Sequence, residues 1–153
     1  MEGEKVVATN RKARHEYHIG ERFEAGIALQ GTEVKSIREG KINLKEAYCS
    51  IENGQVTLLN CHISPYTHGT HFNHEPRRPR RLLLHRREIG KLRKAVEQKG
   101  FTLVPLRVYL KRGLAKVEIG VAQGKKQYDK RADIAERESR RSLDRVLKEA
   151  RNR

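Results

Sequence analysis

The sequence predicts a small antiparallel β-barrel with one or two helices packed against it. Two short segments with alternating apolar residues flank an Asn-Gly dipeptide at residues 53–54, and a second pair flanks Arg112-Gly113. A further segment, residues 23–29, alternates strictly between apolar and other side chains. Short strands separated by turn residues are typical of small barrels. The 153 residues fit one such domain followed by a tail.

The first part of the chain is polar and basic, and we expect residues 1–12 to form a flexible lead-in. The alternation from Phe23 to Leu29 predicts a half-buried strand. Residues 31–38 carry apolar side chains three positions apart, ahead of Gly40, so we expect a short helix there.

The Asn53-Gly54 pair is the clearest turn signal in the chain. It lies between residues 48–52 and 55–59, and a two-residue Asn-Gly loop favours a type I′ hairpin. The implied pairs are Glu52 with Gln55, Ile51 with Val56 and Cys49 with Leu58. The apolar pairs fall on one face, as a buried sheet requires.

A second hairpin is predicted to turn at Arg112-Gly113. The implied apolar pairs are Leu110 with Ala115, Val108 with Val117 and Leu106 with Ile119. The opposite face pairs Arg107 with Glu118 and Tyr109 with Lys116. That face is polar and is free to meet solvent or RNA.

Between the hairpins, residues 85–99 predict a helix. Ile89, Leu92 and Val96 have helical spacing, and Gly100 suits the position just after a helix ends. The outer face of this helix is basic and contains Arg86, Arg87, Lys91, Arg93 and Lys94.

The charge of the chain narrows its class of partner. It has 34 Lys and Arg residues against 19 Asp and Glu, a net charge of +15. Such a field suits nucleic acid, because each neutralised phosphate releases counterions. The charge therefore favours a barrel of the oligonucleotide-binding type, which the strand count alone does not separate from other small barrels. An apolar span, a lipidation motif and a secretory segment are all lacking, so we predict a cytoplasmic protein without a membrane partner.

The residues that bind metals elsewhere do not predict a metal site or a cofactor here. Cys49 and Cys61 are too few and too poorly spaced for a zinc site, and we expect both to be buried, unbonded thiols. Four histidines are close in sequence but do not have the spacing of one helical face, with only Glu75 as a nearby acidic ligand. These histidines are His62, His68, His71 and His74.

An arginine-rich segment is the first candidate for RNA contact. Residues 75–94 contain nine Lys or Arg and two acidic residues. Guanidinium groups grip phosphate with two parallel hydrogen bonds and stack on bases. We predict RNA binding through Arg77, Arg78, Arg80 and Arg81, with a solvated basic loop as the alternative. At least one of the three leucines at 82–84 must be exposed, because successive strand residues point to opposite faces.

A second candidate lies in residues 10–17, where basic side chains are mixed with ring side chains. This mixture suits single-stranded or loop RNA. The candidate contacts are Arg11, Lys12, Arg14 and His15. His15 with Glu16 or Glu24 also resembles a nuclease acid–base pair, but no third group or metal cluster supports that reaction.

The C-terminal segment is almost devoid of apolar residues. From Gln123 to Arg153 it has 11 Lys or Arg and 6 Asp or Glu, and residues 132–150 contain neither Gly nor Pro. Opposite charges four positions apart support a helix, yet the segment cannot bury enough surface to fold alone. We predict a tail that is disordered in solution and helical on a polyanion. A frayed basic terminus is the alternative.

Five blocks together resemble one family. Residues 24–40, which read Glu-Ala-Gly-Ile-Ala-Leu-Gln-Gly-Thr-Glu-Val-Lys-Ser-Ile-Arg-Glu-Gly, resemble the signature of the bacterial SsrA-binding protein family (small protein B). Residues 10–17, 62–66, 80–85 and 124–131 resemble further blocks in the same order. Together they cover nearly the whole chain and are far more specific than any single block.

The resemblance implies an oligonucleotide-binding-type barrel at residues 13–123 with about three helices, followed by a basic tail at residues 124–153. It implies binding to the tRNA-like domain of transfer-messenger RNA and entry into stalled bacterial ribosomes, where the tail is helical in the empty mRNA channel against small-subunit rRNA. Alanyl-tRNA synthetase and elongation factor Tu are then indirect partners, reached through the RNA. The family is not enzymatic.

Residue roles follow from the matched blocks. Asn10, Glu24 and Leu83 correspond to contacts with the tRNA-like domain. The tail residues that correspond to ribosome contacts are Lys125, Lys126, Tyr128, Asp129, Lys130 and Arg131. Two other hypotheses stay open: a generic ribosomal or tRNA-binding barrel, and an RNA-processing enzyme that uses His15 and Glu24.

Overall fold

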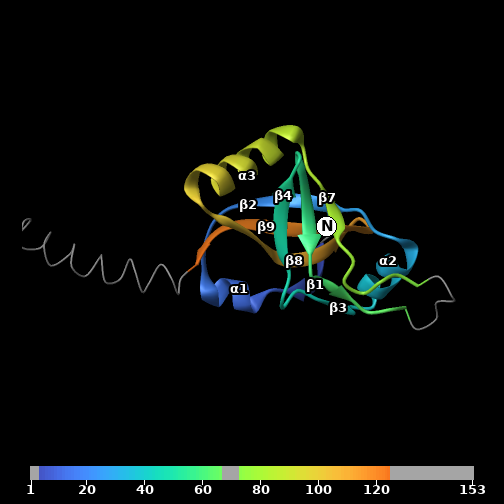
Figure 1. Cartoon of the computed structure of the whole chain (residues 1–153). Coiled ribbons are helices and arrows are strands. Elements are labelled where there is room, and N and C mark those ends of the chain that lie inside the picture. Colours follow the sequence, from blue (N-terminus) through green and yellow to red (C-terminus); the bar gives the residue numbers. More distant parts are fainter. Residues whose placement is uncertain (1–3, 67–72, 125–153) are drawn as a thin grey trace, which may run out of the picture.

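A computed structural model describes residues 4–66 and 73–124 of the chain (Figure 1). It contains nine strands: β1 (Glu4–Thr9), β2 (Tyr17–Ile27), β3 (Ile42–Asn43), β4 (Tyr48–Glu52), β5 (Gln55–Leu59), β6 (His62–Ile63), β7 (Arg80–Leu83), β8 (Thr102–Lys111) and β9 (Leu114–Gly124). Its helices are α1 (Arg11–Glu16), α2 (Gly31–Arg38) and α3 (Arg86–Lys99).

The main sheet closes on itself. Its strand order is β1-β8-β4-β5-β7-β2-β9, and an additional β8–β9 pairing joins its two sides into a ring. Every pairing is antiparallel. β3 and β6 form a separate two-stranded sheet. The predicted small antiparallel barrel with about three helices is confirmed.

Both predicted hairpins are present, and the first has the predicted register throughout. Asn53 and Gly54 have φ angles of 54° and 73°, the positive values that a type I′ turn requires. The second hairpin turns at Arg112 with Val108 opposite Val117, as predicted. The predicted pairing of Leu106 with Ile119 is wrong. A bulge between Pro105 and Arg107 shifts the register, so that Pro105 lies opposite Ile119.

The N-terminal region differs from the expected flexible lead-in. Residues 4–9 form β1, which pairs with β8 between Arg107 and Lys111. The first barrel residues therefore lie well before residue 13. Alternation is weak in this segment because β1 is an edge strand whose side chains are mostly exposed.

Two apolar clusters lie on opposite sides of the β2–β9 ribbon. The larger one fills the barrel and includes Phe23, Ile37, Leu58, Leu92 and Ile119. The smaller one lies under α1 and consists of Ala13, Val104, Leu106 and Ala122, with Tyr17 and Ile19 packed against it. Figure 1 shows α1 and α3 on opposite sides of β2 and β9.

The predicted helices at residues 31–38 and 85–99 are confirmed as α2 and α3, and each begins with a capping box. In α3, the Glu88 side chain accepts a hydrogen bond from the backbone N–H of His85, the residue that precedes the helix. The helix ends at Gly100, whose φ of 67° suits glycine. Cys49 and Cys61 are buried and unbonded, as expected. Among the described residues, no helix is long and apolar enough to cross a membrane.

Candidate nucleic-acid interface

One side of the barrel wall carries several of the predicted RNA-binding residues. Antiparallel partners point to the same side of a sheet, and Glu24 lies opposite Glu118, with both side chains pointing outward. Phe23, beside it, points into the core. On the neighbouring strand Leu83 lies opposite Gly26. We call the outward side of β7, β2, β9 and β8 the outer face.

A shallow depression of about 400 Å³ lies on the outer face. It brings together Glu24 and Leu83, two residues that the family blocks single out, although they are far apart in sequence. Leu83 is 52% exposed, and Gly26 beside it leaves its side chain open to a ligand. The depression is lined by Glu24, Gly26, Leu83, Leu84, His85, Glu88 and Lys116. An apolar side chain next to a carboxylate and a cation suits a ribose or base edge.

The Glu24 carboxylate is held by two donors. The Tyr109 hydroxyl donates a hydrogen bond to its Oε2, and Lys111 Nζ lies 3.5 Å from the same oxygen. The hydrogen bond from Tyr109 has the largest effect and lowers the pKa of Glu24. Partial burial opposes it, and the nearby Lys111 and Lys116 lower the pKa further. Glu24 is therefore ionised at neutral pH, and its other oxygen can accept a hydrogen bond from a base or a 2′-hydroxyl.

A band of ion pairs continues the outer face toward α1. Arg107 donates to Glu118 at 3.3 Å and to Glu4 on β1 at 3.0 Å. Its guanidinium stacks over the Tyr109 ring, 4.3 Å from the centroid. Arg22 Nη1 lies 3.9 Å from Glu118 and is largely exposed. The pairing of Arg107 with Glu118 agrees with the predicted polar face of this hairpin.

α1 covers the far end of the same face and carries the second candidate group. It packs on Val104, Leu106 and Ala122 through the buried Ala13. The four candidate RNA contacts on α1 are exposed: Arg11, Lys12, Arg14 and His15. The predicted cations of residues 10–17 and the pair of Glu24 and Leu83 thus lie on one continuous side of the barrel.

Asn10 has a different role from the predicted RNA contact. Its side chain is buried, with 5% exposure of the residue, and its Oδ1 accepts a hydrogen bond from Ala13 N at 3.0 Å. Its Nδ2 donates to Pro105 O at 2.9 Å. The first N–H groups of a helix need acceptors, and Asn10 supplies one while tying α1 to β8. The structure therefore corrects the prediction, because Asn10 holds α1 in place from inside the protein.

The four arginines of the basic segment divide into two pairs. Arg77 and Arg81 are exposed, as an RNA contact requires. Arg80 is fully buried and Arg78 is half-buried, and both bind the carboxylate of Glu33 on α2. The predicted contact through Arg80 is therefore wrong, and the guanidinium of Arg78 is already occupied. A buried carboxylate is the reason, since an ion pair of this kind needs complete hydrogen bonding in the interior.

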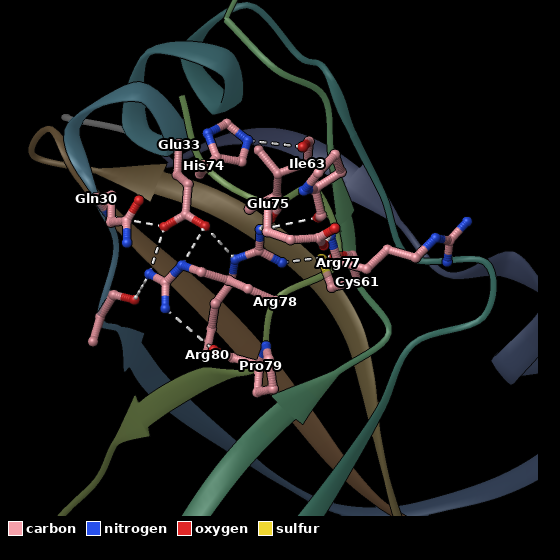
Figure 2. Close-up of polar contacts among 12 residues, drawn as sticks. Gln30, Glu33, Cys61, Ile63, His74, Glu75, Arg77, Arg78, Pro79 and Arg80 are labelled. Atoms are coloured by element: carbon pink, nitrogen blue, oxygen red, sulfur yellow. Dashed lines mark hydrogen bonds and ion pairs between the residues drawn. The ribbon is translucent and has the colours of Figure 1, made fainter. Parts of the chain in front are cut away.

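Figure 2 shows how the Glu33 carboxylate is surrounded by donors. Its Oε1 accepts from Arg78 Nη2 at 2.7 Å and from Gln30 N at 2.7 Å. Its Oε2 accepts from Arg78 Nε at 2.9 Å and from Arg80 Nε at 2.8 Å. Burial alone would raise the pKa of Glu33, but these hydrogen bonds outweigh it and hold the pKa below its usual value.

The alternative sites receive no support from the described geometry. His74 is buried and its ring nitrogens lie 2.8 Å from Thr32 Oγ1 and 2.9 Å from Ile63 O, so both are used within the fold. Among the described residues no group of His, Cys, Asp and Glu has the arrangement of a metal site. The lowered pKa of Glu24 is the opposite of the shift that a general acid needs. His68, His71 and the six predicted tail residues lie outside the described residues.

Sequence reasoning missed Glu33, Lys111 and Lys116 as parts of this region. Their roles depend on partners in distant parts of the chain, as with Arg80, which pairs with a residue 47 positions earlier. The signal for Lys116 was its place opposite Tyr109 on the polar side of the second hairpin, which the register confirms.

The fold and the outer face together define a small basic barrel of the oligonucleotide-binding type. Residues 7–149 match the family model described as "SmpB protein". The chain therefore belongs to the SmpB protein family.

Similar proteins agree with this assignment. The chain is 58% identical over 145 residues to the SsrA-binding protein of Pelotomaculum thermopropionicum, covering 95% of each chain. It is 60% identical over 149 residues to the SsrA-binding protein of Trichodesmium erythraeum, covering 97% of this chain and 96% of the other. A solved structure described as "tmRNA-SmpB: a journey to the center of the bacterial ribosome" has a TM-score of 0.65 and 52% identity, covering 76% of this chain and 82% of that one.

Proposed function

We propose that this protein binds the tRNA-like domain of transfer-messenger RNA and delivers it to bacterial ribosomes that have stalled. One observation carries the proposal: the outer face joins Glu24, Leu83 and the exposed cations of α1 on one side of the barrel. The relatives named SsrA-binding protein and the transfer-messenger RNA complex on the ribosome support the same partner. The place of action is then the bacterial cytoplasm, where translation occurs.

The arrangement explains how a shape-dependent RNA contact is built. Exposed cations at α1 and at Arg81 attract phosphates and set the orientation of the RNA. Glu24 repels phosphate, so its position in the depression favours a base or ribose hydroxyl there. Leu83 adds apolar contact to the same group. RNA recognition of this kind reads shape and unpaired nucleotides rather than a duplex sequence.

The proposed tail function separates from RNA binding. The basic tail, residues 124–153, enters the empty mRNA channel as a helix and contacts small-subunit rRNA, with Asp129, Lys130 and Arg131 at its entry into the channel. Alanyl-tRNA synthetase and elongation factor Tu act on the RNA and reach this protein only through it. The protein itself performs no covalent chemistry and serves as a binding adaptor.

Deleting residues 129–153 tests the division between barrel and tail. The truncated protein is expected to bind the isolated tRNA-like domain within about twofold of the full chain, since the outer face is intact. The proposed delivery rescues the stalled ribosome and leads to tagging of the incomplete protein, and the truncated protein is expected to lose this tagging completely. A large loss of affinity for the isolated RNA would contradict the proposal and favour a generic basic RNA binder.

The enzymatic alternative has its own test. The full-length protein is incubated with bare RNA carrying the tRNA-like domain, and the RNA is examined for cleavage or modification. We expect an unchanged RNA after long incubation. If the unaltered protein forms a product and the variant His15→Ala does not, the enzyme hypothesis is supported instead.

A further inference from the structure

We propose that Glu33 is a positioning residue of the RNA interface: through Arg78 and Arg80 it locks the loop of residues 75–79 and strand β7, so that Arg77, Arg81 and Leu83 are presented to RNA in one arrangement. This inference rests on the proposed function. Glu33 itself is fully buried, so it acts on RNA only through its arginine partners.

The loop is folded around the guanidinium of Arg80. Its Nη2 donates to Pro76 O at 3.0 Å and to Glu75 O at 3.4 Å, and its Nη1 donates to Cys61 O at 2.7 Å. Its Nε donates to Glu33. All the nitrogens of this side chain are therefore used to hold backbone carbonyls and one carboxylate (Figure 2).

Arg78 ties the same loop to the strand that carries Glu24. Its Nη2 lies 3.4 Å from Ala28 O, just beyond the end of β2, and its Nη1 donates to Pro79 O at 3.2 Å. Ala28 N in turn donates to Arg81 O at 2.9 Å. Glu33, Arg78 and Arg80 thus set the relative position of β2 and β7, the two strands that bring Glu24 beside Leu83.

The exposed side chains follow from this lock. Along β7 the residues alternate, with Arg80 and Leu82 buried and Arg81 and Leu83 exposed. The side chain that anchors the strand therefore sits next in sequence to one that faces RNA. A loop ordered in advance loses less conformational freedom on binding, which raises affinity without a new contact.

Arg78 could contact an RNA phosphate directly, or it could act by positioning the loop. The two roles predict different results when Arg78 is replaced by lysine. The variant Arg78→Lys keeps the positive charge, so a direct phosphate contact is retained. It loses the two-pronged bond of Nε and Nη2 to Glu33, because an ammonium is a point charge. A loss of RNA binding in this variant therefore reports position rather than charge.

The test measures binding of the full-length protein to the tRNA-like domain as a function of salt. We expect Arg78→Lys to weaken binding about tenfold and to lower the slope of log K against log salt by about one, as if a phosphate contact were lost. Arg81→Ala is expected to do the same. The affinity of the double variant is expected to fall about tenfold rather than about a hundredfold. The reason is that each substitution removes the same contact, that of Arg81 with phosphate.

Glu33→Gln extends the test, with Glu39→Gln as its matched control. Both remove one negative charge from the α2 region, but Glu39 is exposed and pairs with Lys41 at the surface. Only Glu33→Gln is expected to weaken RNA binding and to be coupled to Arg81→Ala. If it does not fold, as judged by circular dichroism, Arg78→Lys decides the question, since the bond of Glu33 to Arg80 survives there.

Unchanged affinity and salt slope in Arg78→Lys would overturn the inference, and so would full additivity with Arg81→Ala. A different result would contradict the proposed function. If the unaltered protein binds ordinary tRNA as tightly as the tRNA-like domain, the partner is wrong, while the coupling between these arginines is still measurable on either RNA.

Discussion

The Tyr109 hydroxyl on β8 donates a hydrogen bond to the carboxylate of Glu24 on β2, on the outer face, where β9 lies between these two strands. Tyr109 is itself 2% exposed, with the Arg107 guanidinium over its ring. A residue buried in the barrel wall therefore aims an exposed carboxylate at the depression beside Leu83. The contact links the packing of β8 to the proposed recognition of RNA.

Removing this hydroxyl is expected to weaken RNA binding without unfolding the protein. In Tyr109→Phe, Glu24 keeps Lys111 as a partner but loses its strongest donor. We expect a fall in affinity for the tRNA-like domain of about three- to tenfold, and a stability loss of about 0.5–1.5 kcal/mol. Binding titration and urea denaturation measure the two effects. Tyr48→Phe, an exposed tyrosine on β4, is the control and should change neither.

The contribution of this hydrogen bond to stability depends on pH. The pKa of Glu24 is lowered from 4.5 in the folded protein, so ionised Glu24 stabilises the fold above that value. The contribution is lost as pH falls through the lower folded pKa. We expect the difference in free energy of unfolding between the unaltered protein and Tyr109→Phe to be largest near pH 7 and to shrink below pH 4.5. A difference that grows in acid would contradict the geometry.

Both cysteines are expected to resist thiol reagents in the folded protein. Burial raises the pKa of the Cys61 thiol to about 11 and raises that of Cys49 further above its usual value. At pH 8 neither thiolate is accessible, so a thiol-reactive dye should label neither residue until denaturant is added. Rapid labelling of one cysteine in the native protein would show that the barrel opens locally.

A substitution at Gly120, with one at Gly90 as its control, tests the packing of the apolar cluster that lies under α1. A Cβ at Gly120 would lie 2.9 Å from both Ile19 Cγ2 and Leu106 Cδ1, so Gly120→Ala is expected to destabilise the protein by about 1–3 kcal/mol. Gly90→Ala in α3 is the control, because, apart from its chain neighbours and the backbone of α3 itself, no atom lies within 4 Å of the added Cβ. It should stabilise the protein by about 0.4–1 kcal/mol. Thermal denaturation that ranks the variants in the reverse order would refute the packing described here.

The parts of the fold with local signals were predictable. Asn53-Gly54 and Arg112-Gly113 specify their turns through residues that accept positive φ, and the apolar pattern then determines the register. The bulge between Pro105 and Arg107 was not predictable, because it depends on how β8 meets β1 and β9. β1 was missed because its pairing with β8, rather than its own pattern, makes it a strand.

The candidate site was predictable in composition but not in the role of each residue. The basic segment was identified from its arginines, yet only the structure separates exposed Arg77 and Arg81 from Arg78 and Arg80. That division depends on Glu33, which local sequence does not connect with the loop. Similarly, Asn10 matches the family block but acts as a helix cap.

Competitive binding at near-physiological salt separates specific recognition of the tRNA-like domain from general attraction to a basic protein. Labelled tRNA-like domain of transfer-messenger RNA is bound to the full-length protein and challenged with excess ordinary tRNA. We expect the label to stay bound, because Glu24 and Leu83 recognise a feature beyond phosphate charge. Displacement by ordinary tRNA at equal concentration would contradict it, since the net charge of +15 would then be sufficient to explain the binding.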